Sequence, residues 1–442
     1  MNIFFISLGC DKNLSDSEMM MGLLHDHGYE FTDDENLADV IVVNTCGFIS
    51  DAKEESINTI LSMAEYKKDR CKALIVTGCL SQRYQDEIQK ELPEIDAIVG
   101  TTAFDRIVEV IDETLKGHAI NALDSIDRLC RPEVKRVITT GGYYSYLKIA
   151  EGCNKRCTYC SIPNIRGAYR SIPMDQLIEE AQYLANNGIK ELILVAQETT
   201  VYGQDLYGHK SLSELLRKLC RIKGIEWIRL LYCYPEEIDD ELILTIREEK
   251  KICHYLDMPI QHASDDILRR MGRWTTRKEL EAIIAGLRRE IPDICLRTTL
   301  ITGFPGETQA EHEELLDFID EMEFDRLGVF AYSPEEDTPA ASFQDQVDEE
   351  TKLSRLDELM ALQQEVSIDK SERMIGRELE VIIEGIATDA GEEVYVARSY
   401  MDAPNVDGYV FIHTEENLMS GDFAKVKVTG ALEYDLIGEL IE

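Results

Sequence analysis

The sequence lacks any long apolar run and any leader-like amino terminus. No uninterrupted apolar stretch in the 442 residues is long enough to span a bilayer. The first residues, MNIFFISLGCDKN, hold only a short apolar run with no basic segment before it, which predicts a buried strand rather than a signal peptide. These features exclude a protein with spanning helices and favour a soluble cytoplasmic one.

Basic side chains are scarce compared with acidic ones. The chain has 46 Lys and Arg residues against 85 Asp and Glu residues, a formal net charge of −39. Because nucleic-acid affinity depends mostly on Lys and Arg that neutralise phosphates, such a surface does not favour a polyanionic partner. Two interpretations remain open: general solubility in an acidic proteome, and a strongly basic partner.

Internal repeats and low-complexity tracts are also missing, and the chain is too long for one core. Over 1–130, apolar runs alternate with amphipathic stretches, which predicts an α/β domain with a parallel sheet. Over 140–373, six strand candidates alternate with helices, which predicts a partial (β/α)6 barrel. Over 376–442, short strands broken by Gly, Asp and Asn predict a small all-β barrel. Residues 118–142 are expected to form a linker or an edge strand.

The expected strands can be given by their sequences. Those of the first unit are NIFFISL, ADVIVVN, ALIVTG and DAIVG; those of the second are YLKIA, ELILVAQ, WIRLLY, YLDMPI, CLRTTLITG and RLGVFAY; those of the third are RELEVIIEGI, EVYVARSY, DGYVFIHT, DFAKVKVTG and DLIGELI. Helices are expected at 15–28, 51–67, 81–91, 103–116, 175–187, 211–222, 236–249, 263–271, 276–290, 308–323 and 348–373.

Cysteine is the residue type whose spacing carries chemistry. Twelve cysteines in a reducing compartment are not expected to form a disulfide framework. The sequence EGCNKRCTYCSIP places Cys153, Cys157 and Cys160 directly after YLKIA, close enough to bind three corners of a cubane cluster. With no fourth cysteine nearby, one iron is left open for a small molecule. The alternative is a structural zinc site, but tetrahedral zinc needs four ligands at paired spacings.

This motif at the end of the first strand of a β/α barrel is similar to that of the radical S-adenosylmethionine superfamily. The resemblance implies that the open iron chelates the amino and carboxylate groups of S-adenosylmethionine. It also implies that an electron from the cluster cleaves the sulfonium to a 5′-deoxyadenosyl radical, which abstracts an unactivated hydrogen.

The same resemblance implies cofactor contacts from several other positions. Tyr159 matches the aromatic residue before the last cysteine. Gln197 and Glu198 follow the second barrel strand, Arg229 lies on the third, and Gly303 opens the turn GFPGE. All are expected at carboxyl ends of barrel strands or on inward-facing positions, where active sites of such barrels lie.

A second trio of cysteines is dispersed over the first domain. Cys10, Cys46 and Cys79 each come just past an expected parallel strand, and the carboxyl ends of such strands share one edge of the sheet. The trio can therefore converge on one site, as a second cluster. The alternative is three buried structural cysteines. A glycine, which allows close backbone approach, adjoins each cysteine: Gly9, Gly47 and Gly78.

An α/β domain with dispersed cysteines, a radical barrel and a small β-barrel together resemble the methylthiotransferases over essentially the whole chain. The resemblance implies two [4Fe-4S] clusters, the second of which carries the sulfur to be inserted. One S-adenosylmethionine supplies the methyl group and another the radical, so that a C–H bond becomes C–S–CH3. It also implies an electron donor such as flavodoxin or ferredoxin.

Within this family, three stretches resemble the branch, RimO-like, that modifies an aspartate β-carbon of the small-subunit ribosomal protein S-twelve. They are SLGCDKNLSDSE, with Asp11 where that branch more often has proline, AYSPEEDTPA and RSYMDAPNVDGYVFI. The tail from Gly376 to Glu442 has 4 Lys and Arg against 15 Asp and Glu, a net charge of −11. It lacks the basic groove that RNA binding requires, and it suits a basic ribosomal protein, free or in the small subunit.

Two other functions remain as alternatives. One is methylthiolation of adenosine in transfer RNA by the other main branch. The second belongs to a different class, a non-enzymatic iron–sulfur carrier, which needs two clusters but no S-adenosylmethionine site.

Overall fold

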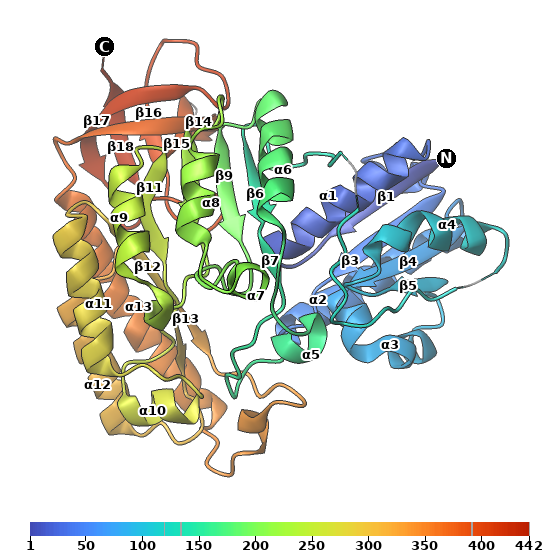
Figure 1. The fold of residues 1–442 in the computed structure, drawn as a ribbon, viewed down its shortest axis with the longest axis horizontal. Coiled ribbons are helices and arrows are strands. Elements are labelled where there is room, and N and C mark those ends of the chain that lie inside the picture. The colour runs from blue at the N-terminus through green and yellow to red at the C-terminus, as the bar shows by residue number, and fades with distance from the viewer. Residues whose placement is uncertain (119, 133–134, 390–391, 442) are drawn as a thin grey trace.

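The computed structural model describes residues 1–118, 120–132, 135–389 and 392–441. Two parallel sheets lie side by side, and a closed barrel covers one end of the second sheet (Figure 1). The expected fold class, an α/β chain ending in an all-β barrel, is confirmed. No helix within the described ranges is both long and apolar enough to cross a membrane.

The first unit is a five-stranded parallel sheet in the order β2-β1-β3-β4-β5. Alternate residues of β3 enter different apolar cores: Val40 and Val42 face one layer of helices, and Ile41 and Val43 face the other. The sheet is therefore covered on both faces, which explains its continuous apolar strands. Its elements are β1 (Asn2–Ser7), α1 (Asp11–Asp26), β2 (Glu30–Phe31), η1 (Glu35–Leu37), β3 (Val40–Thr45), α2 (Ser50–Ala64), η2 (Glu65–Lys68), β4 (Ala73–Gly78), α3 (Cys79–Glu91), β5 (Ala97–Val99), η3 (Phe104–Arg106) and α4 (Ile107–Leu115).

The segment expected as a linker or an edge strand is a linker. Its described residues form only an isolated bridge, between Ala122 and Val99. Residues 133 and 134 of the stretch RPEVKRVITTGGYYSY lie outside the described residues. The first strand of the next sheet begins at Tyr144.

The second unit is a six-stranded, all-parallel sheet in the order β6-β9-β10-β11-β12-β13, with β6 and β13 at its open edges. All six expected strands are present, so the partial barrel is confirmed. The strands are β6 (Tyr144–Lys148), β9 (Glu191–Val195), β10 (Trp227–Leu230), β11 (Ile252–Asp257), β12 (Cys295–Thr302) and β13 (Arg326–Ala331).

Helices cover the outer face of this sheet, and two of them begin with a capping box that the sequence encodes. Thr276 and Glu279, and likewise Thr308 and Glu311, exchange side-chain and backbone hydrogen bonds. The remaining elements are the hairpin β7 (Ala150–Glu151) and β8 (Arg170–Ser171), the helices α5 (Ile162–Arg166), α6 (Met174–Asn186), α7 (Gln204–Tyr207), α8 (Leu212–Leu219), α9 (Asp240–Glu248), α10 (Asp265–Arg270), α11 (Arg277–Glu290), α12 (Gln309–Met322) and α13 (Glu349–Glu372), and the turns η4 (Pro235–Glu237) and η5 (Pro339–Ser342).

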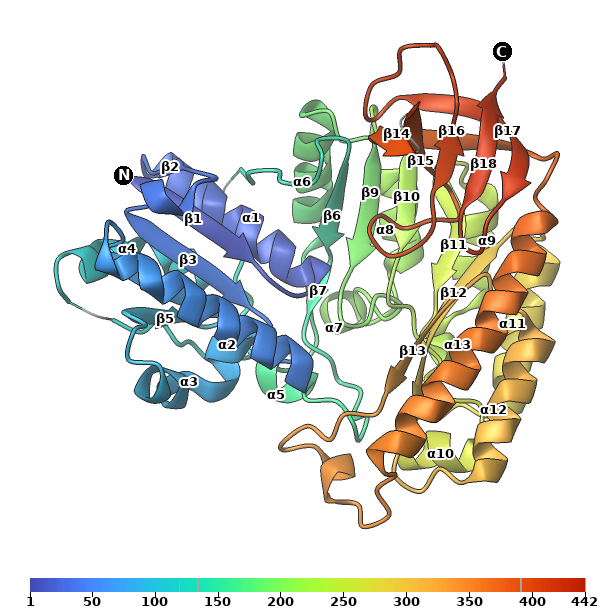
Figure 2. The same cartoon turned by 180° about the vertical axis from the view of Figure 1, so that it is seen from behind.

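The third unit is a closed five-stranded barrel in the order β14-β15-β16-β18-β17. Its apolar core is continuous with the inner face of the second sheet: Trp227 of β10 stacks edge-on against Phe423, with ring centroids 5.0 Å apart. Figure 2 shows the barrel at the end of the sheet away from the arrowheads of β6 and β9, so the carboxyl ends remain free of it. Its strands are β14 (Glu378–Asp389), β15 (Glu392–Ser399), β16 (Val410–Ile412), β17 (Phe423–Ala431) and β18 (Leu436–Leu440).

Candidate functional site

The loop of the first cysteine trio is fixed by its backbone. Gly152 has φ +73°, and a Cβ there would lie 2.2 Å from the Ala168 carbonyl oxygen, so only glycine fits. The amide of Cys153 donates to the Gly167 carbonyl at 3.1 Å, and the amide of Cys160 donates to the Cys157 carbonyl at 3.1 Å. The loop therefore presents its three cysteines together beyond the carboxyl end of β6.

The thiols of this trio lie close enough to interact electrostatically. Burial raises the pKa of Cys153 to about 11, and burial together with the charges of Cys157 and Cys153 raises the pKa of Cys160 to about 12. The charges act in this way because thiolates gathered in one place repel each other. A bound metal centre stabilises thiolates, so it would offset the repulsion between them.

Tyr234 is a site residue that the spacing of the cysteines did not reveal. Its hydroxyl lies 3.0 Å from the Cys157 sulfur. The guanidinium of Arg273 and the ammonium of Lys155 lie 4.1 Å and 4.8 Å from the centre of its ring. Tyr234 follows the end of β10 by four positions, and an aromatic residue just past a strand end was the only signal that the sequence offered.

Two acceptors predicted to bind the cofactor lie past the carboxyl end of β9. Gln197 Oε1 and Glu198 Oε2 are buried and have no hydrogen-bond partner among the described residues. Burial raises the pKa of Glu198 to about 7. Buried acceptors without a partner are costly, and a ligand that brings an ammonium group would satisfy both.

Tyr159 and Gly303 also lie at this edge of the sheet. The half-buried ring of Tyr159 packs on the apolar cluster of Met271 and Phe304. Gly303, with φ +68°, follows β12 directly, and a Cβ there would lie 2.3 Å from Lys352 Cγ. Contact of these two residues with the cofactor stays a prediction.

Arg229, which was also predicted to contact the cofactor, binds groups of the protein in this structure. Its side chain is fully buried under the carboxyl-terminal barrel. Nε donates to Glu191 at 2.8 Å, and Nη1 donates to the Tyr400 carbonyl at 2.6 Å. Arg229 faces inward, as expected, but towards the barrel that closes this part of the sheet, so its donors are already used.

The second trio converges as its strand placement predicted. Cys10 caps α1, Cys46 lies between β3 and α2, and Cys79 opens α3. The strands before them, β1, β3 and β4, are neighbours in the sheet, so three residues distant in sequence meet at one edge. Burial, followed by the charge of Cys79, raises the pKa of Cys46 to about 11; the charge of Cys10 adds to this effect.

The glycines beside the second trio are required by close packing. A Cβ on Gly9 would lie 2.9 Å from the Cys46 Cβ, and one on Gly47 would lie 2.9 Å from Leu80 Cα. A Cβ on Gly78, where φ is +96°, would lie 2.3 Å from Asn44 Oδ1. The close approach expected from sequence is therefore present at all three strand ends.

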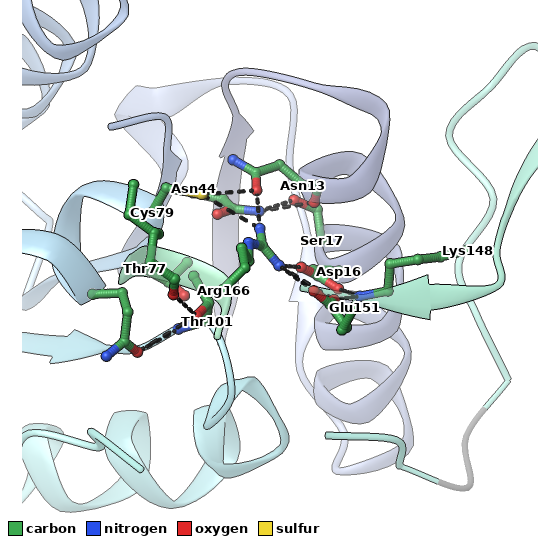
Figure 3. Close-up of polar contacts among 12 residues, drawn as sticks. Asn13, Asp16, Ser17, Asn44, Thr77, Cys79, Thr101, Lys148, Glu151 and Arg166 are labelled. Carbon is green, nitrogen blue, oxygen red and sulfur yellow. Dashed lines mark hydrogen bonds and ion pairs between the residues drawn. The ribbon is translucent and has the colours of Figure 1, made fainter. Parts of the chain in front are cut away.

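A network of charged side chains from the second unit reaches the second trio (Figure 3). Arg166, at the end of α5, lies with Nη2 3.5 Å from the Cys79 sulfur and Nη1 2.9 Å from Asp16. Lys148 bonds both Asp16 and Glu151. Burial would raise the pKa of Glu151, but Lys148 and Arg166 lower it to about 2, so this carboxylate stays ionised.

A second contact from the same unit holds the loop of Cys46. Glu335, in the segment AYSPEEDTPA, is buried and accepts from Lys53 at 3.0 Å and from Arg83 at 3.1 Å. Arg83 in turn donates to the Gly47 carbonyl at 2.9 Å, next to Cys46. The segment therefore binds the first unit beside its cysteines, and we call this set of contacts the clamp. Its sequence did not indicate this role.

Neither trio has the geometry of a single-ion site. In the parts of the chain that the structure describes, no three His, Cys, Asp or Glu side chains gather closely enough to bind one metal ion. A cubane cluster needs a wider spread, because each thiolate binds a different iron. The remaining cysteines are buried or half-buried and form no such group among the described residues: Cys71, Cys130, Cys220, Cys233, Cys253 and Cys295.

Three family models match successive parts of the chain. Residues 2–100 match the uncharacterized protein family UPF0004, residues 147–319 match the radical SAM superfamily, and residues 375–441 match the TRAM domain. Each match falls within one of the three units of the fold.

Full-length relatives decide the family. The ribosomal protein uS12 methylthiotransferase RimO of Lachnoclostridium phytofermentans is 63% identical over 99% of both chains. The protein of the same name from Acetivibrio thermocellus is 52% identical over 99% of this chain and 97% of its own. This chain belongs to the uS12 methylthiotransferase family. This uS12 methylthiotransferase family member is a radical S-adenosylmethionine enzyme with a TRAM domain.

Solved structures agree with the family at the level of the fold. The radical S-adenosylmethionine methyltransferase TsrM of Kitasatospora setae, solved with cobalamin and a [4Fe-4S] cluster, superimposes with a TM-score of 0.56. The match covers 85% of this uS12 methylthiotransferase family member and 78% of TsrM, at 14% identity. At that identity, the shared property is the arrangement of the sheets.

Proposed function

We propose that this enzyme adds a methylthio group to the β-carbon of an aspartate in ribosomal protein uS12. The observation that carries the proposal is the full-length 63% identity to a uS12 methylthiotransferase, in a fold that brings each cysteine trio to the carboxyl edge of a parallel sheet. We assign the second cluster to residues 1–130, the radical chemistry to 140–373 and the accessory barrel to 376–442.

The residues of the first site fit a cluster with one open iron and S-adenosylmethionine. Cys153, Cys157 and Cys160 would each hold one iron. The unpaired oxygens of Gln197 and Glu198 would accept the ammonium of the methionine moiety. When bound, the two clusters and S-adenosylmethionine supply the electron, the radical, the sulfur and the methyl group that turn C–H into C–S–CH3.

The residues of the second site fit a second [4Fe-4S] cluster. Cys10, Cys46 and Cys79 supply three thiols and no fourth, which leaves one iron to carry the inserted sulfur. Arg166 offers a positive charge next to Cys79, which suits a site that gathers negative thiolates and sulfides. Free thiols of this kind need a reducing compartment, which supports a cytoplasmic enzyme served by flavodoxin or ferredoxin.

The surface of the TRAM barrel supports a basic protein as substrate rather than RNA. Two exposed lysines of β17, Lys425 and Lys427, lie across from Glu380 and Glu378 of β14, so their charge is balanced locally. The barrel also exposes carboxylates without such lysines opposite them, among them Glu393, Glu415, Glu416 and Glu433. A basic ribosomal protein, free or in the small subunit, would be attracted to this surface.

The choice of substrate is tested by offering two substrates to one preparation. The reconstituted, reduced enzyme is incubated with S-adenosylmethionine and either a uS12 loop peptide containing the target aspartate or transfer RNA. We expect a methylthio mass increase in the peptide only. Modification of the RNA alone would instead support an adenosine methylthiotransferase.

The same reaction separates an enzyme from an iron–sulfur carrier. We expect release of 5′-deoxyadenosine, which depends on reductant and which a carrier cannot produce. If both clusters load and no 5′-deoxyadenosine forms under reduction, the carrier interpretation replaces the enzymatic one.

A further inference from the structure

One buried guanidinium from the radical S-adenosylmethionine unit touches a cysteine of the other unit. Arg166 is 2% exposed, and its Nη2 lies 3.5 Å from the Cys79 sulfur. The same nitrogen donates to Asn13 Oδ1, and Asn13 in turn donates to the Thr45 carbonyl at 3.0 Å, next to Cys46. Figure 3 shows Arg166 between these groups of the first unit and the carboxylates of Asp16 and Glu151.

The position of this guanidinium is fixed from both sides. Nη1 lies 2.9 Å from Asp16 and 3.3 Å from Glu151, one residue from each unit. The backbone turns sharply after Arg166, because Gly167 has φ +72° and a Cβ there would lie 2.5 Å from the Ile126 carbonyl oxygen. With its two arms bound in different directions, the planar fork of arginine cannot swing away from Cys79.

The charges around Arg166 are balanced within the buried network, so its guanidinium can interact with charge at the cysteine site. Lys148 and Arg166 carry two positive charges, and Asp16 and Glu151 carry two negative ones, so the buried network is neutral before any thiolate is counted. Lys148 bonds Asp16 and Glu151, whereas Arg166 also faces the cysteine site. In a dry interior, a cation so close to a sulfur acts strongly on charge gathered there.

The chain also connects Arg166 directly to the first trio. Arg166 lies six positions after Cys160, and the short helix α5, with Pro163 near its start, connects the two residues. One compact segment therefore begins at a thiol of one site and ends at a guanidinium in the other.

We infer that Arg166 is a positioning residue for the second cluster, holding the Cys79 thiolate and raising the reduction potential of that cluster. The inference rests on the proposed second cluster. Reduction adds negative charge to a cluster, and a nearby cation stabilises the more negative state. Removing the cation must therefore lower the potential.

The test isolates the second cluster in the full chain. Cys153→Ala, Cys157→Ala and Cys160→Ala are combined, so that only Cys10, Cys46 and Cys79 can load. Into this parent we introduce Arg166→Gln, which keeps donors but removes the charge, and Arg166→Lys, which keeps the charge. Iron per chain and the midpoint potential, by electron paramagnetic resonance during redox titration, are measured anaerobically.

A matched control breaks another buried ion pair between the two units. Arg136 is buried and bonds Glu18 of α1 and Glu180 of α6, and its hydrogen bonds with the described residues include none to a cysteine. Arg136→Gln therefore disturbs the interface to a similar degree. We expect it to leave the midpoint potential unchanged.

At the midpoint of the parent, Arg166→Gln should lower the ratio of reduced to oxidised cluster at least about tenfold, or about 59 mV for one electron. Arg166→Lys should recover more than half of this shift. A parent-like or higher potential in Arg166→Gln overturns the inference. A parent that loads no iron instead overturns the proposed second cluster.

If Arg166→Gln fails to load the second cluster, thermal unfolding of the apoproteins identifies the cause. If Arg166→Gln and Arg136→Gln unfold at the same temperature and only the former fails to load iron, the loss supports positioning of Cys79. If Arg166→Gln unfolds at a clearly lower temperature, its role is general stability, and the inference is wrong.

Discussion

Cys153, Cys157 and Cys160 lie on one loop, whereas Cys10, Cys46 and Cys79 come from the ends of three separate strands. In the first site, the short spacing on one loop and the backbone hydrogen bonds of that loop keep the thiols together. In the second site, the thiols meet because β1, β3 and β4 are adjacent and parallel. The first trio therefore depends on local backbone, and the second on the packing of a whole domain.

The two sites also differ in what holds them from outside. The first trio lies within the radical S-adenosylmethionine unit, and Tyr234 of the same unit touches Cys157. The second trio depends on the neighbouring unit, through Arg166 at Cys79 and through Glu335, which binds Arg83 of α3 and so holds the loop of Cys46. The second site should therefore be the more sensitive to changes at the domain interface.

The largest expected effect comes from removing thiols. Any one of Cys153→Ala, Cys157→Ala and Cys160→Ala should abolish cleavage of S-adenosylmethionine, because the open iron requires three ligands on the others. Release of 5′-deoxyadenosine under reducing conditions measures this. Undiminished release from any of the three variants would contradict the assignment of the radical cluster.

Thiol removal in the other trio should separate the two activities. Cys10→Ala, Cys46→Ala or Cys79→Ala should leave release of 5′-deoxyadenosine intact but stop formation of the methylthiolated peptide. The mass of the peptide after reaction is the measurement. Continued methylthiolation would show that this trio does not deliver the sulfur.

The next effect concerns the clamp on the loop of Cys46. Glu335→Ala leaves Lys53 and Arg83 without their shared carboxylate, and breaking a buried pair in this way should lower the free energy of unfolding by about 4 kcal/mol. Urea unfolding measures the change. Iron bound to the second trio should also fall, while the first trio stays loaded.

The neighbouring Glu336 provides the control for the clamp. Its exposed carboxylate accepts a hydrogen bond from the Tyr84 hydroxyl, while Arg83 donates to its backbone carbonyl, which the mutation keeps. Glu336→Ala should cost no more than about 0.5 kcal/mol. An equal loss of unfolding free energy in the two variants would show that Glu335 has no special role in the clamp.

A smaller effect tests the packing that brings the dispersed cysteines together. Gly78→Ala combines about 1.5 kcal/mol of backbone strain with about 2 kcal/mol of overpacking, because φ +96° with ψ −155° is a region that essentially only glycine adopts and the new Cβ would meet the Thr45 carbonyl oxygen. Gly28→Ala, at φ +91° with no atom within 4 Å, should show about 1 kcal/mol of positive-φ strain without overpacking. Urea unfolding of both variants gives the difference, and similar losses would mean that the close approach at Gly78 is relaxed easily.

Sequence alone could predict the strands and both trios because those signals are local or periodic. Continuous apolar runs such as IVV in β3 identify buried parallel strands, and a cysteine that follows such a strand lies at the edge of the sheet. The short strand β2 was missed, because Glu30 and Phe31 are too few residues to show a pattern. Element ends shifted by a few residues; α1, for example, begins at Asp11 rather than near residue 15.

Contacts between distant parts of the chain could not be predicted. Arg229 resembled a cofactor contact, but its partners, Glu191 and the Tyr400 carbonyl, belong to elements far away in sequence. The stretch RSYMDAPNVDGYVFI, which identifies the substrate branch, is used in a similar way: Asp402 binds Arg326 at 2.6 Å, and Asp407 accepts from Tyr255 at 2.8 Å. Its buried carboxylates attach the barrel to the central sheet, so that part of the motif has a structural role.

The smallest effect is a dependence on pH that only the first site should show. Burial raises the pKa of Glu198 from its ordinary 4.5 to about 7, so the folded protein keeps a proton that the unfolded chain releases. The stability contributed by this proton is complete below about pH 4.5 and is lost as the pH rises through 7. Glu198→Gln should remove that loss, as thermal unfolding of the apoprotein at pH 6 and pH 8 would show.

The affinity for S-adenosylmethionine should rise with pH, whereas the stability contributed by the Glu198 proton falls. The ammonium of the methionine moiety favours the ionised carboxylate, whose fraction rises about tenfold between pH 6 and pH 8 for a pKa near 7. Calorimetric affinity in the loaded enzyme should therefore rise by up to about tenfold over this range, and the rise should vanish in Glu198→Gln. Variants that lack the second trio should keep this rise in affinity with pH, because Glu198 belongs to the first site. If the slope instead disappeared with Cys79→Ala, the two sites would be coupled electrically, and their comparison as separate centres would no longer hold.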